Sequence, residues 1–470
     1  MKKIALILVG LFAFVACEIE VKKEANKIAS ISDEVLETAV IYEANIRQYS
    51  KDGTFEAFTK DIPQLKELGV KIIWLMPVFP ISQTKRKATG GDFASKLIDP
   101  KEREKALGSY YAVSDFKKIN PEFGTIEDFR MLVKVAHENG MYVILDWVPN
   151  HTGWDHTWIK TNPEFYTKNA KGEITDPLNN DGTPVGWADV ADLNYDSEGL
   201  RAEMVKDMQY WITKEEVDGF RCDVAGSVPT DFWQGAIPKL RAKKDIFMLA
   251  EAWEPELLKE GLFDMAYGWD RHHALNDIAK GEIGAKKWDE NYQKDIARYE
   301  ADDILMNFVT NHDENSWNGT INERMGAAAE ALTALSYVVP GMPLIYSGQE
   351  YGLSHRLKFF EKDSIPHTKG ETWNLLRALG ELKNKSHALN GGKNPAEYIR
   401  LKTENEVLAL VRKKGNDAVV YIANLSKQSI STSIKITGDY RNFITGEKVS
   451  LIDLESSVFA PWEYRILVKE

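Results

Sequence analysis

Cysteine and positive charge are both scarce in this chain of 470 residues. It has two cysteines, Cys17 and Cys222. Its 59 Lys and Arg residues are outnumbered by 71 Asp and Glu residues, which gives a formal net charge of −12 at pH 7. An acidic chain repels nucleic acid and anionic surfaces, so neither is expected as a partner. The length suffices for a large buried core and predicts two or three domains.

Hydrophobic runs long enough to span a bilayer are absent as well. The apolar run at the N-terminus is too short to do so comfortably. The segment MKKIALILVGLFAFVAC has a basic start and an apolar run, and we interpret residues 1–16 as a signal peptide. FVAC resembles a bacterial lipoprotein box, which implies lipidation of Cys17. The chain would then lie in the bacterial cell envelope, at the outer membrane, with the lipid as its only membrane contact. The alternative is an ordinary signal peptide with a chance cysteine, and a secreted protein.

If Cys17 is lipidated, Cys222 is the only thiol left, so the mature chain has no intramolecular disulfide. Residues 17–36 are polar, carry no clear motif and are interpreted as a tether.

Eight short apolar runs follow, and they alternate with amphipathic stretches such as residues 125–140. Continuous apolar strands separated by helices predict a parallel sheet covered on both faces. Eight such units suit an α/β fold of the (β/α)₈ TIM-barrel type over residues 37–385. A doubly wound open sheet is the alternative, but no G-x-G-x-x-G follows the first run. The runs are residues 39–49, 70–79, 141–151, 218–224, 245–253, 262–269, 304–313 and 342–350.

Two segments depart from this alternation. Residues 152–195 are rich in turn formers and poor in helical periodicity, which predicts a short insertion after the third strand. Residues 386–470 change to short alternating strands, which predicts a C-terminal antiparallel β-sandwich domain.

Polar clusters end five of the eight runs. Side chains in a strand alternate between faces, so Arg221 and Asp223 of GFRCDV point the same way. Taken alone, such a pair is most often a structural ion pair. Several strands that deliver carboxylates and histidines to one rim of a barrel instead predict a shared site, because the loops after the strands build the active site of this fold. The other members are Tyr42, Glu43, Asp146, Asn150, His151, Glu251, Asn311, His312 and Asp313.

These segments, in this order and on these strands, resemble the short conserved regions of the α-amylase family of glycoside hydrolases (family 13). The stretches LGVKIIWLMPVF, VADLN and GMPLIYSGQE resemble further motifs of the same family. The resemblance extends from about residue 38 to the C-terminus. It implies a retaining enzyme that acts on α-glucans.

Transferred residue by residue, the resemblance implies that Asp223 is the nucleophile, Glu251 the general acid and base, and Asp313 the third carboxylate, which grips sugar hydroxyls. Arg221 would orient Asp223 and lower its pKa. Four further residues, Tyr111, Asp146, His151 and His312, would contact the sugar, with Tyr110 as the alternative to Tyr111. Trp253 and Trp154 are aromatic candidates for further sugar contacts and could equally be core residues.

A structural Ca²⁺ between the barrel and the insertion is also implied, because Asn150 and Asp192 match the family's ligands and oxygen donors suit Ca²⁺. The alternative is a hydrogen-bonded loop without metal. Neither H-x-x-x-H nor C-x-x-C spacing occurs, which argues against catalytic zinc.

The sequence therefore predicts hydrolysis of α-1,4-glucosidic bonds in starch-like α-glucans and maltooligosaccharides through a covalent glycosyl-enzyme. A transglycosylase of the same fold and a non-catalytic α-glucan-binding protein are the alternatives.

One departure from the family bears on substrate size. After Asp223 the chain reads VAGSV, with Gly226 and Ser227 where many α-amylases carry Lys-His. Fewer side chains on the leaving-group side predict that short oligosaccharides are cut nearly as efficiently as starch.

Overall fold

The structure of the chain, a computed structural model, describes residues 28–470 with the exception of residue 180. Cys17 and the predicted signal peptide lie outside the described residues. No helix in the described part of the chain is long and apolar enough to cross a membrane.

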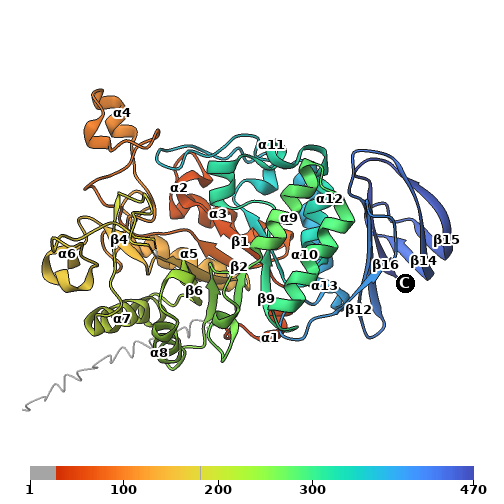
Figure 1. Cartoon of the computed structure of the whole chain (residues 1–470), viewed down its shortest axis with the longest axis horizontal. Coiled ribbons are helices and arrows are strands. Elements are labelled where there is room, and N and C mark those ends of the chain that lie inside the picture. The colour runs from red at the N-terminus through yellow and green to blue at the C-terminus, as the bar shows by residue number, and fades with distance from the viewer. Residues whose placement is uncertain (1–27, 180) are drawn as a thin grey trace, which may run out of the picture.

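Eight parallel strands close into a barrel in the order β1-β10-β9-β8-β7-β6-β3-β2, which confirms the predicted TIM barrel (Figure 1). Each of the eight apolar runs supplies one strand. Residues such as Ile72, Ile144 and Leu249 fill the barrel interior, and the opposite faces of the strands pack under the helices. The strands are β1 (Val40–Ala44), β2 (Val70–Leu75), β3 (Tyr142–Trp147), β6 (Gly219–Cys222), β7 (Phe247–Ala250), β8 (Met265–Tyr267), β9 (Ile304–Asn307) and β10 (Met342–Tyr346).

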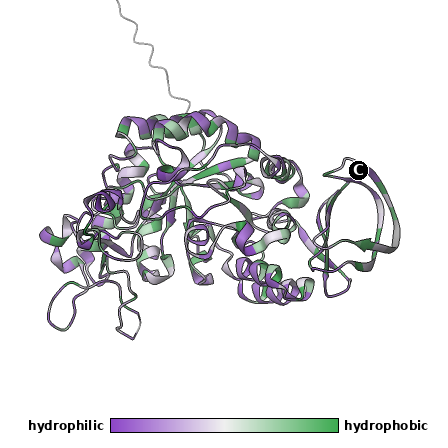
Figure 2. Ribbon diagram, turned by 90° about the horizontal axis from the view of Figure 1, so that it is seen from above, coloured by the Kyte–Doolittle hydropathy of each residue, from purple (hydrophilic) through white to green (hydrophobic). Residues whose placement is uncertain are grey.

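Helices surround the strands, and Figure 2 shows hydrophobic strands at the centre with hydrophilic residues on the outer helix faces. The helix starts follow ordinary capping chemistry. Thr125, for example, forms a reciprocal capping box with Asp128 at the start of α5. The helices are α1 (Asp33–Thr38), α2 (Ile46–Tyr49), α3 (Phe55–Leu65), α4 (Pro100–Lys105), α5 (Ile126–Glu138), α6 (Trp158–Thr161), α7 (Glu198–Lys214), α8 (Thr230–Arg241), α9 (Trp269–Lys280), α10 (Gly284–Arg298), α11 (Ile321–Met325), α12 (Ala329–Val338) and α13 (Glu371–Lys385).

Helix α1 begins within residues 17–36, the segment that the sequence suggested as a tether, and ends two residues beyond it. Ser32 caps it, and its Leu36 is buried in the same apolar cluster as the barrel interior. The packed fold therefore begins before residue 37, because α1 covers apolar residues at the N-terminal end of the barrel.

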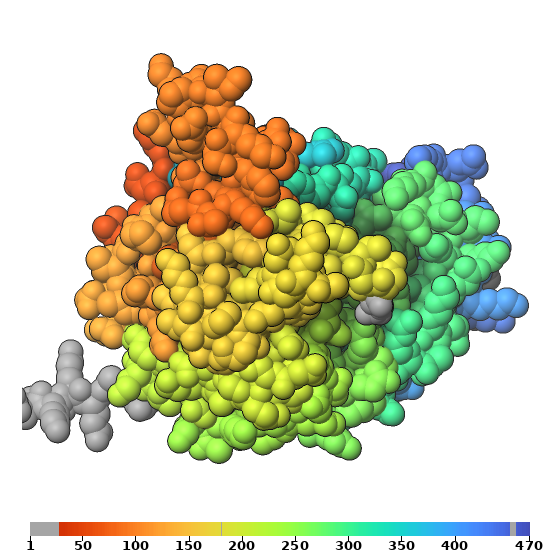
Figure 3. All heavy atoms as spheres, turned by 60° about the vertical axis from the view of Figure 1, so that its left-hand side comes forward, coloured from red at the N-terminus to blue at the C-terminus, as the bar shows by residue number. Residues whose placement is uncertain are grey.

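Two insertions, rather than one, stand on the C-terminal side of the strands. The predicted insertion contains the antiparallel pair β4 (His151–Gly153) and β5 (Val190–Asp192). A second long connection, residues 76–125, joins β2 to α5 and carries α4. The two pack side by side (Figure 3), with the Gly153 N–H donating to the Val113 carbonyl (2.7 Å) and Lys87 paired with Asp189 (3.1 Å). This second insertion was not predicted from the sequence.

The C-terminal domain is antiparallel, as predicted, with its strands in the order β11-β12-β13-β16-β14-β15. The β14–β15 hairpin is bonded to β16 only near Tyr440–Asn442, and Ile434 and Phe459 of the hairpin share an apolar cluster with Val407 and Val420. The strands are β11 (Glu397–Leu401), β12 (Val407–Lys414), β13 (Asp417–Asn424), β14 (Ile430–Asn442), β15 (Lys448–Phe459) and β16 (Tyr464–Lys469).

A buried arginine joins this domain to the barrel. Arg412 of β12 donates to the carbonyls of Val338 (2.6 Å), at the end of α12, and Asn390 (2.7 Å). Tyr421 donates to the Ala331 carbonyl in the same helix (2.8 Å). Because buried backbone carbonyls are costly to leave unpaired, these bonds tie the C-terminal domain to the barrel.

Candidate active site

Most of the polar residues predicted to share a site do meet at the C-terminal rim of the barrel. Tyr42 does not, because its side chain lies on the opposite face of β1, packs on Phe58 and donates to Glu350. Asp146 lies in β3 and Arg221 in the adjacent β6, and the two face each other in the strand register. Asp223 follows β6 by one residue, Glu251 follows β7 directly, and Asp313 lies in the loop after β9. Their side chains converge because parallel strands of a closed barrel all end at the same rim.

One guanidinium holds three of the carboxylates. Nη1 of Arg221 donates to Asp146 Oδ1 (2.7 Å) and to Asp223 Oδ1 (3.0 Å), while Nη2 forms an ion pair with Glu251 Oε2 (2.7 Å). The Arg221 side chain is completely buried. The guanidinium makes charge-assisted contacts with all three carboxylates, although Nη2 has no hydrogen bond of good geometry, and it fixes the positions of the carboxylates relative to one another.

A strained backbone residue adds a second constraint on Glu251. Val224, directly after Asp223, has φ +40° and ψ +43°, a left-handed conformation that β-branched residues rarely adopt. In this conformation the Val224 N–H donates to Glu251 Oε2 (2.8 Å). Val224, which follows Asp223, thus positions the Glu251 carboxylate. Backbone strain of this kind is typical of functional sites.

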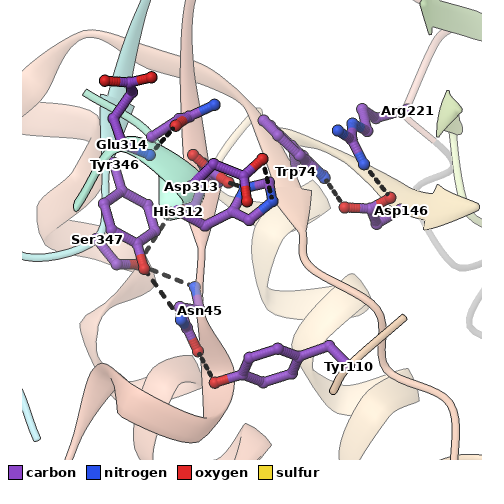
Figure 4. A network of polar contacts seen from close by, with 12 residues as sticks. Asn45, Trp74, Tyr110, Asp146, Arg221, His312, Asp313, Glu314, Tyr346 and Ser347 are labelled. Atoms are coloured by element: carbon purple, nitrogen blue, oxygen red, sulfur yellow. Dashed lines mark hydrogen bonds and ion pairs between the residues drawn. The ribbon is translucent and has the colours of Figure 1, made fainter. Parts of the chain in front are cut away.

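A second network runs through His312 (Figure 4). Its Nδ1 lies 2.5 Å from Glu43 Oε1, and its Nε2 lies 2.8 Å from the Tyr111 hydroxyl. Nε2 also lies 3.3 Å from Oδ2 of the adjacent Asp313, which Figure 4 shows beside His312. The Tyr111 hydroxyl donates to Asp146 Oδ2 (3.0 Å), so the two networks meet at Asp146. The ring of Tyr111 stacks on that of His312, whereas Tyr110 is buried and donates to Asn45. The structure therefore places Tyr111, rather than Tyr110, at the rim.

Two members of these networks, Trp74 and Tyr267, were not assigned to the site from the sequence. Trp74 Nε1 donates to Asp146 Oδ2 (3.2 Å), and Arg221 Nε donates to the Tyr267 hydroxyl (3.2 Å). Each lies within an apolar barrel strand and carries a polar atom into the interior. The sequence does show a Trp and a Tyr, each with one polar atom, inside apolar strands, but an isolated Trp or Tyr in such a strand is ordinarily a core residue.

The remaining predicted residues lie around this centre. His151 is buried, contacts the half-exposed Trp187 ring (5.7 Å) and has its pKa lowered by burial to about 4. Trp253 is 44% exposed and stacks on Trp269. Trp154 is covered by Lys85 and donates to the Ala188 carbonyl, so it joins the two insertions.

Asn150 and Asp192 lie next to each other across the β4–β5 pair. The Leu193 N–H donates to the Asn150 carbonyl, and His151 is registered opposite Asp192. Burial raises the pKa of the Asp192 carboxyl to about 6, and no described Lys, Arg or His forms an ion pair with it. A partly buried carboxylate without a paired cation is a donor that Ca²⁺ would stabilise, and Asn150 and Asp192 supply oxygen atoms of the kind that the ion prefers. Within residues 28–470, apart from residue 180, no group of three or more His, Cys, Asp or Glu side chains is arranged to hold a metal.

The electrostatics at the centre differ from the expectation of a lowered pKa for Asp223, although Arg221 itself acts in the expected direction. Burial raises that pKa well above its usual range, and the charges of Glu251, Asp146 and Asp313 add to the effect while Arg221 opposes it. Burial likewise raises the pKa of Asp146 to about 6, against the charge of Arg221. The expectation was wrong because one guanidinium is shared among three carboxylates in a site with little water.

Neutralising Asp223 should therefore stabilise the fold. A carboxyl whose pKa is higher in the folded state than in the unfolded chain destabilises the fold once the pH exceeds its unfolded value. We expect Asp223→Asn to unfold at a higher temperature than the parent at pH 7, with the difference shrinking as the pH falls toward about 4. Asp231→Asn, at an exposed aspartate paired with Arg201, is the control and should give no gain. A lower unfolding temperature for Asp223→Asn at pH 7 would contradict this view of the site.

Comparison with known proteins agrees with the geometry. The family model described as "Alpha amylase, catalytic domain" matches residues 33–176 and 184–375. A crystal structure of a noncanonic maltogenic α-amylase, AmyB from Thermotoga neapolitana, is 28% identical, with a TM-score of 0.79 over 92% of this chain and 99% of that one. An α-amylase structure from Lactobacillus plantarum is also 28% identical, with a TM-score of 0.78 over 93% of this chain and 100% of that one.

Among curated proteins, α-amylase MalA of Haloarcula japonica is 25% identical over 427 residues, which cover 87% of this chain but only 59% of that protein. A 4-α-glucanotransferase of Thermotoga neapolitana is 27% identical over 354 residues, or 67% of this chain and 71% of that protein. The matched catalytic domain, together with the carboxylates gathered at the barrel rim, shows that the chain belongs to the α-amylase family.

Proposed function

We propose that this protein is a retaining glycoside hydrolase that cleaves α-1,4-glucosidic bonds of maltooligosaccharides and starch-like α-glucans. The observation that carries the proposal is the sharing of one guanidinium by Asp223 and Glu251. Retention requires two carboxyl groups roughly 5 Å apart, and two groups paired with the same arginine suit that separation. Inverting enzymes need a wider gap, of roughly 6.5–9.5 Å, to admit a water molecule.

In the first step Asp223 attacks the anomeric carbon while the Glu251 carboxyl gives its proton to the leaving oxygen. A covalent glycosyl-Asp223 ester forms, and the shortened glucan leaves as an alcohol. Attack by Asp223 requires its charged form, and Arg221 is the cation that favours that form. In the second step Glu251 takes a proton from water, which attacks the same carbon and regenerates Asp223.

A transglycosylase would use the same residues, with a sugar hydroxyl in place of water as the second nucleophile. The similarity of this chain to a 4-α-glucanotransferase supports transglycosylation as the alternative. The ratio of longer products to hydrolysed ones from maltotriose separates the two activities. A non-catalytic binding protein is disfavoured, because such a protein has no need of three carboxylates crowded around one buried arginine.

The role of Glu251 can be tested by leaving-group dependence. Glu251→Gln should lose several orders of magnitude on maltooligosaccharides, whose leaving group needs a proton. It should retain most of the first-step rate on activated aryl α-glycosides, which need little protonation. Burst kinetics measure that step, and Glu256→Gln, at an exposed position of the same loop, is the control. Equal first-step losses on both kinds of substrate would contradict an acid role.

A row of aromatic rings leads away from the reacting sugar. The Phe359 ring is nearly parallel to that of Tyr111 (10°, 6.4 Å), and Trp317 contacts both Phe359 (5.0 Å) and Phe360 (5.8 Å). Trp317 is 51% exposed. Sugar rings pack on aromatic faces, so we propose that this row binds glucose units beyond the reacting one.

The opposite, leaving-group side offers less room. Gly226 stands where many α-amylases carry a basic side chain, and the atom nearest to a Cβ there would be Oε2 of the exposed Glu254 (2.4 Å), so no bulky side chain of this chain binds the leaving group at that position. We therefore propose efficient action on short maltooligosaccharides.

Trp317→Ala tests the aromatic row. It should lower kcat/KM for maltoheptaose by about tenfold, the loss expected when an exposed ring worth ~1.4 kcal/mol is removed, and should leave the value for maltotriose within about threefold. The measurement is the initial rate of hydrolysis of both substrates at concentrations below KM. An equal loss on the two substrates would overturn the assignment of this row to distal sugar binding.

We propose in addition that Asn150 and Asp192 hold a structural Ca²⁺, which would bind the β4–β5 insertion without taking part in bond cleavage. A ligand that binds only the folded state raises its stability. Millimolar Ca²⁺ should thus raise the unfolding temperature relative to a chelator, and Asp192→Asn should abolish that difference. Asp181→Asn, in an exposed turn of the same insertion, should retain it. An unfolding temperature that is identical in Ca²⁺ and in chelator would rule out the ion.

Lipidation of Cys17, and with it a place in the bacterial cell envelope, stays a proposal supported by the N-terminal sequence alone. Release of the protein from the membrane fraction by Cys17→Ser tests it.

A further inference from the structure

Glu43 is a buried carboxylate that the proposed bond cleavage does not use directly. It lies in β1, is inaccessible to solvent, and its Oε1 contacts His312 Nδ1. Its other oxygen, Oε2, is buried without a hydrogen-bond partner. An incompletely paired carboxylate in a barrel interior is costly, so its presence calls for a role beyond packing.

Hydrogen-bond accounting defines the protonation of His312. Burial raises the pKa of Glu43, and the charges of His312 and Arg221 oppose that shift. An ionised Glu43 only accepts, so Nδ1 of His312 then carries the proton in their contact. The Tyr111 hydroxyl gives its own proton to Asp146, which also accepts from Trp74 and Arg221. The Tyr111 oxygen is then the acceptor for His312, and Nε2 must carry a proton as well.

We propose that Glu43 is a positioning residue that keeps His312 as a doubly protonated imidazolium, whose Nε2–H stands beside Asp313 as a charged donor to the sugar. The sugar contact rests on the proposed function, whereas the protonation does not. A charged donor next to an ionised acceptor can grip two neighbouring hydroxyls by charge-assisted bonds, which are about twice as strong as neutral ones.

The surrounding charges favour this state. Burial alone would lower the pKa of His312, but the charges of Asp313 and Glu43 outweigh burial and the repulsion from Arg221, and the pKa reaches about 9. The groups that face the imidazole are Glu43 from β1, the Trp74 ring from β2, Tyr111 from the 76–125 insertion, Asp146 from β3, Arg221 from β6 and the adjacent Asp313. Of the carboxylates among them, Glu43 is the one that contacts Nδ1.

The experiment compares Glu43→Gln with the parent by two readouts. NMR of ¹⁵N-labelled histidine follows the ring nitrogens of His312, with His312→Gln used to assign the signal. The parent should show two protonated nitrogens at pH 7.5. Glu43→Gln, which keeps the shape and removes the charge, should show a neutral ring at that pH, with a pKa lower by at least about one unit.

The second readout is the pH profile of kcat/KM on maltotriose. If Glu43 acts through the charge of His312, the alkaline limb of Glu43→Gln should shift to lower pH by a similar amount. The rate should fall about tenfold at pH 8 and stay within about threefold of the parent at pH 5.5. Glu350→Gln is the matched control, since Glu350 is an equally buried carboxylate that bonds Tyr42 and Gly348 away from His312.

A uniform loss at all pH values would show a merely structural role and overturn the proposal. So would a neutral His312 in the parent at pH 7.5, a result that requires no variant to fold. The NMR titration needs no substrate, so it separates failure of this inference from failure of the proposed function. A doubly protonated His312 in a protein that is inactive on α-glucans would contradict the proposed function and leave this inference standing.

Discussion

The pairing of the buried Arg221 with Asp146, Asp223 and Glu251 is the interaction on which the rest of the site depends. One positive charge cannot neutralise three carboxylates, so the arrangement is costly and survives only because the barrel imposes it. Strands β3, β6 and β7 are neighbours in the barrel, and their ends bring these residues together whether or not the charges favour it. Trp74, Tyr111 and Tyr267 then enclose the guanidinium and exclude water, which strengthens each bond to it.

Much of this could be read from the sequence, because the features concerned are local. Eight continuous apolar runs separated by helices specify a covered parallel sheet, and each run became a barrel strand. The polar residues that end the runs reached the same rim because strand direction is uniform in such a barrel. The 76–125 insertion could not be recognised, since irregular polar chain carries no periodicity that separates it from an ordinary loop. Its docking on the predicted 152–195 insertion depends on contacts such as Lys87 with Asp189, which only the folded chain brings together.

The electrostatics were the least predictable part. Spacing in the chain reveals that Arg221 and Asp223 share a face, and from that pair alone a lowered pKa of Asp223 follows. Spacing does not reveal that Asp146 and Glu251 compete for the same guanidinium, or that burial outweighs its charge. Glu43 and His312 are 269 residues apart, and their contact likewise exists only in the closed barrel. The site therefore carries destabilising charge that the surrounding fold must offset, as expected where function and stability conflict.

The central claim is that Asp223 and Glu251, held by one arginine, act as nucleophile and acid on the same glycosidic bond. The configuration of the first product tests it most directly. Proton NMR of maltooligosaccharide cleavage, recorded before mutarotation proceeds, reports whether the new reducing end is formed as the α or the β anomer. Two displacements at one carbon retain configuration, so the account predicts that the α anomer appears first. Initial formation of the β anomer would show a single displacement by water and contradict the assignment of Asp223 as nucleophile.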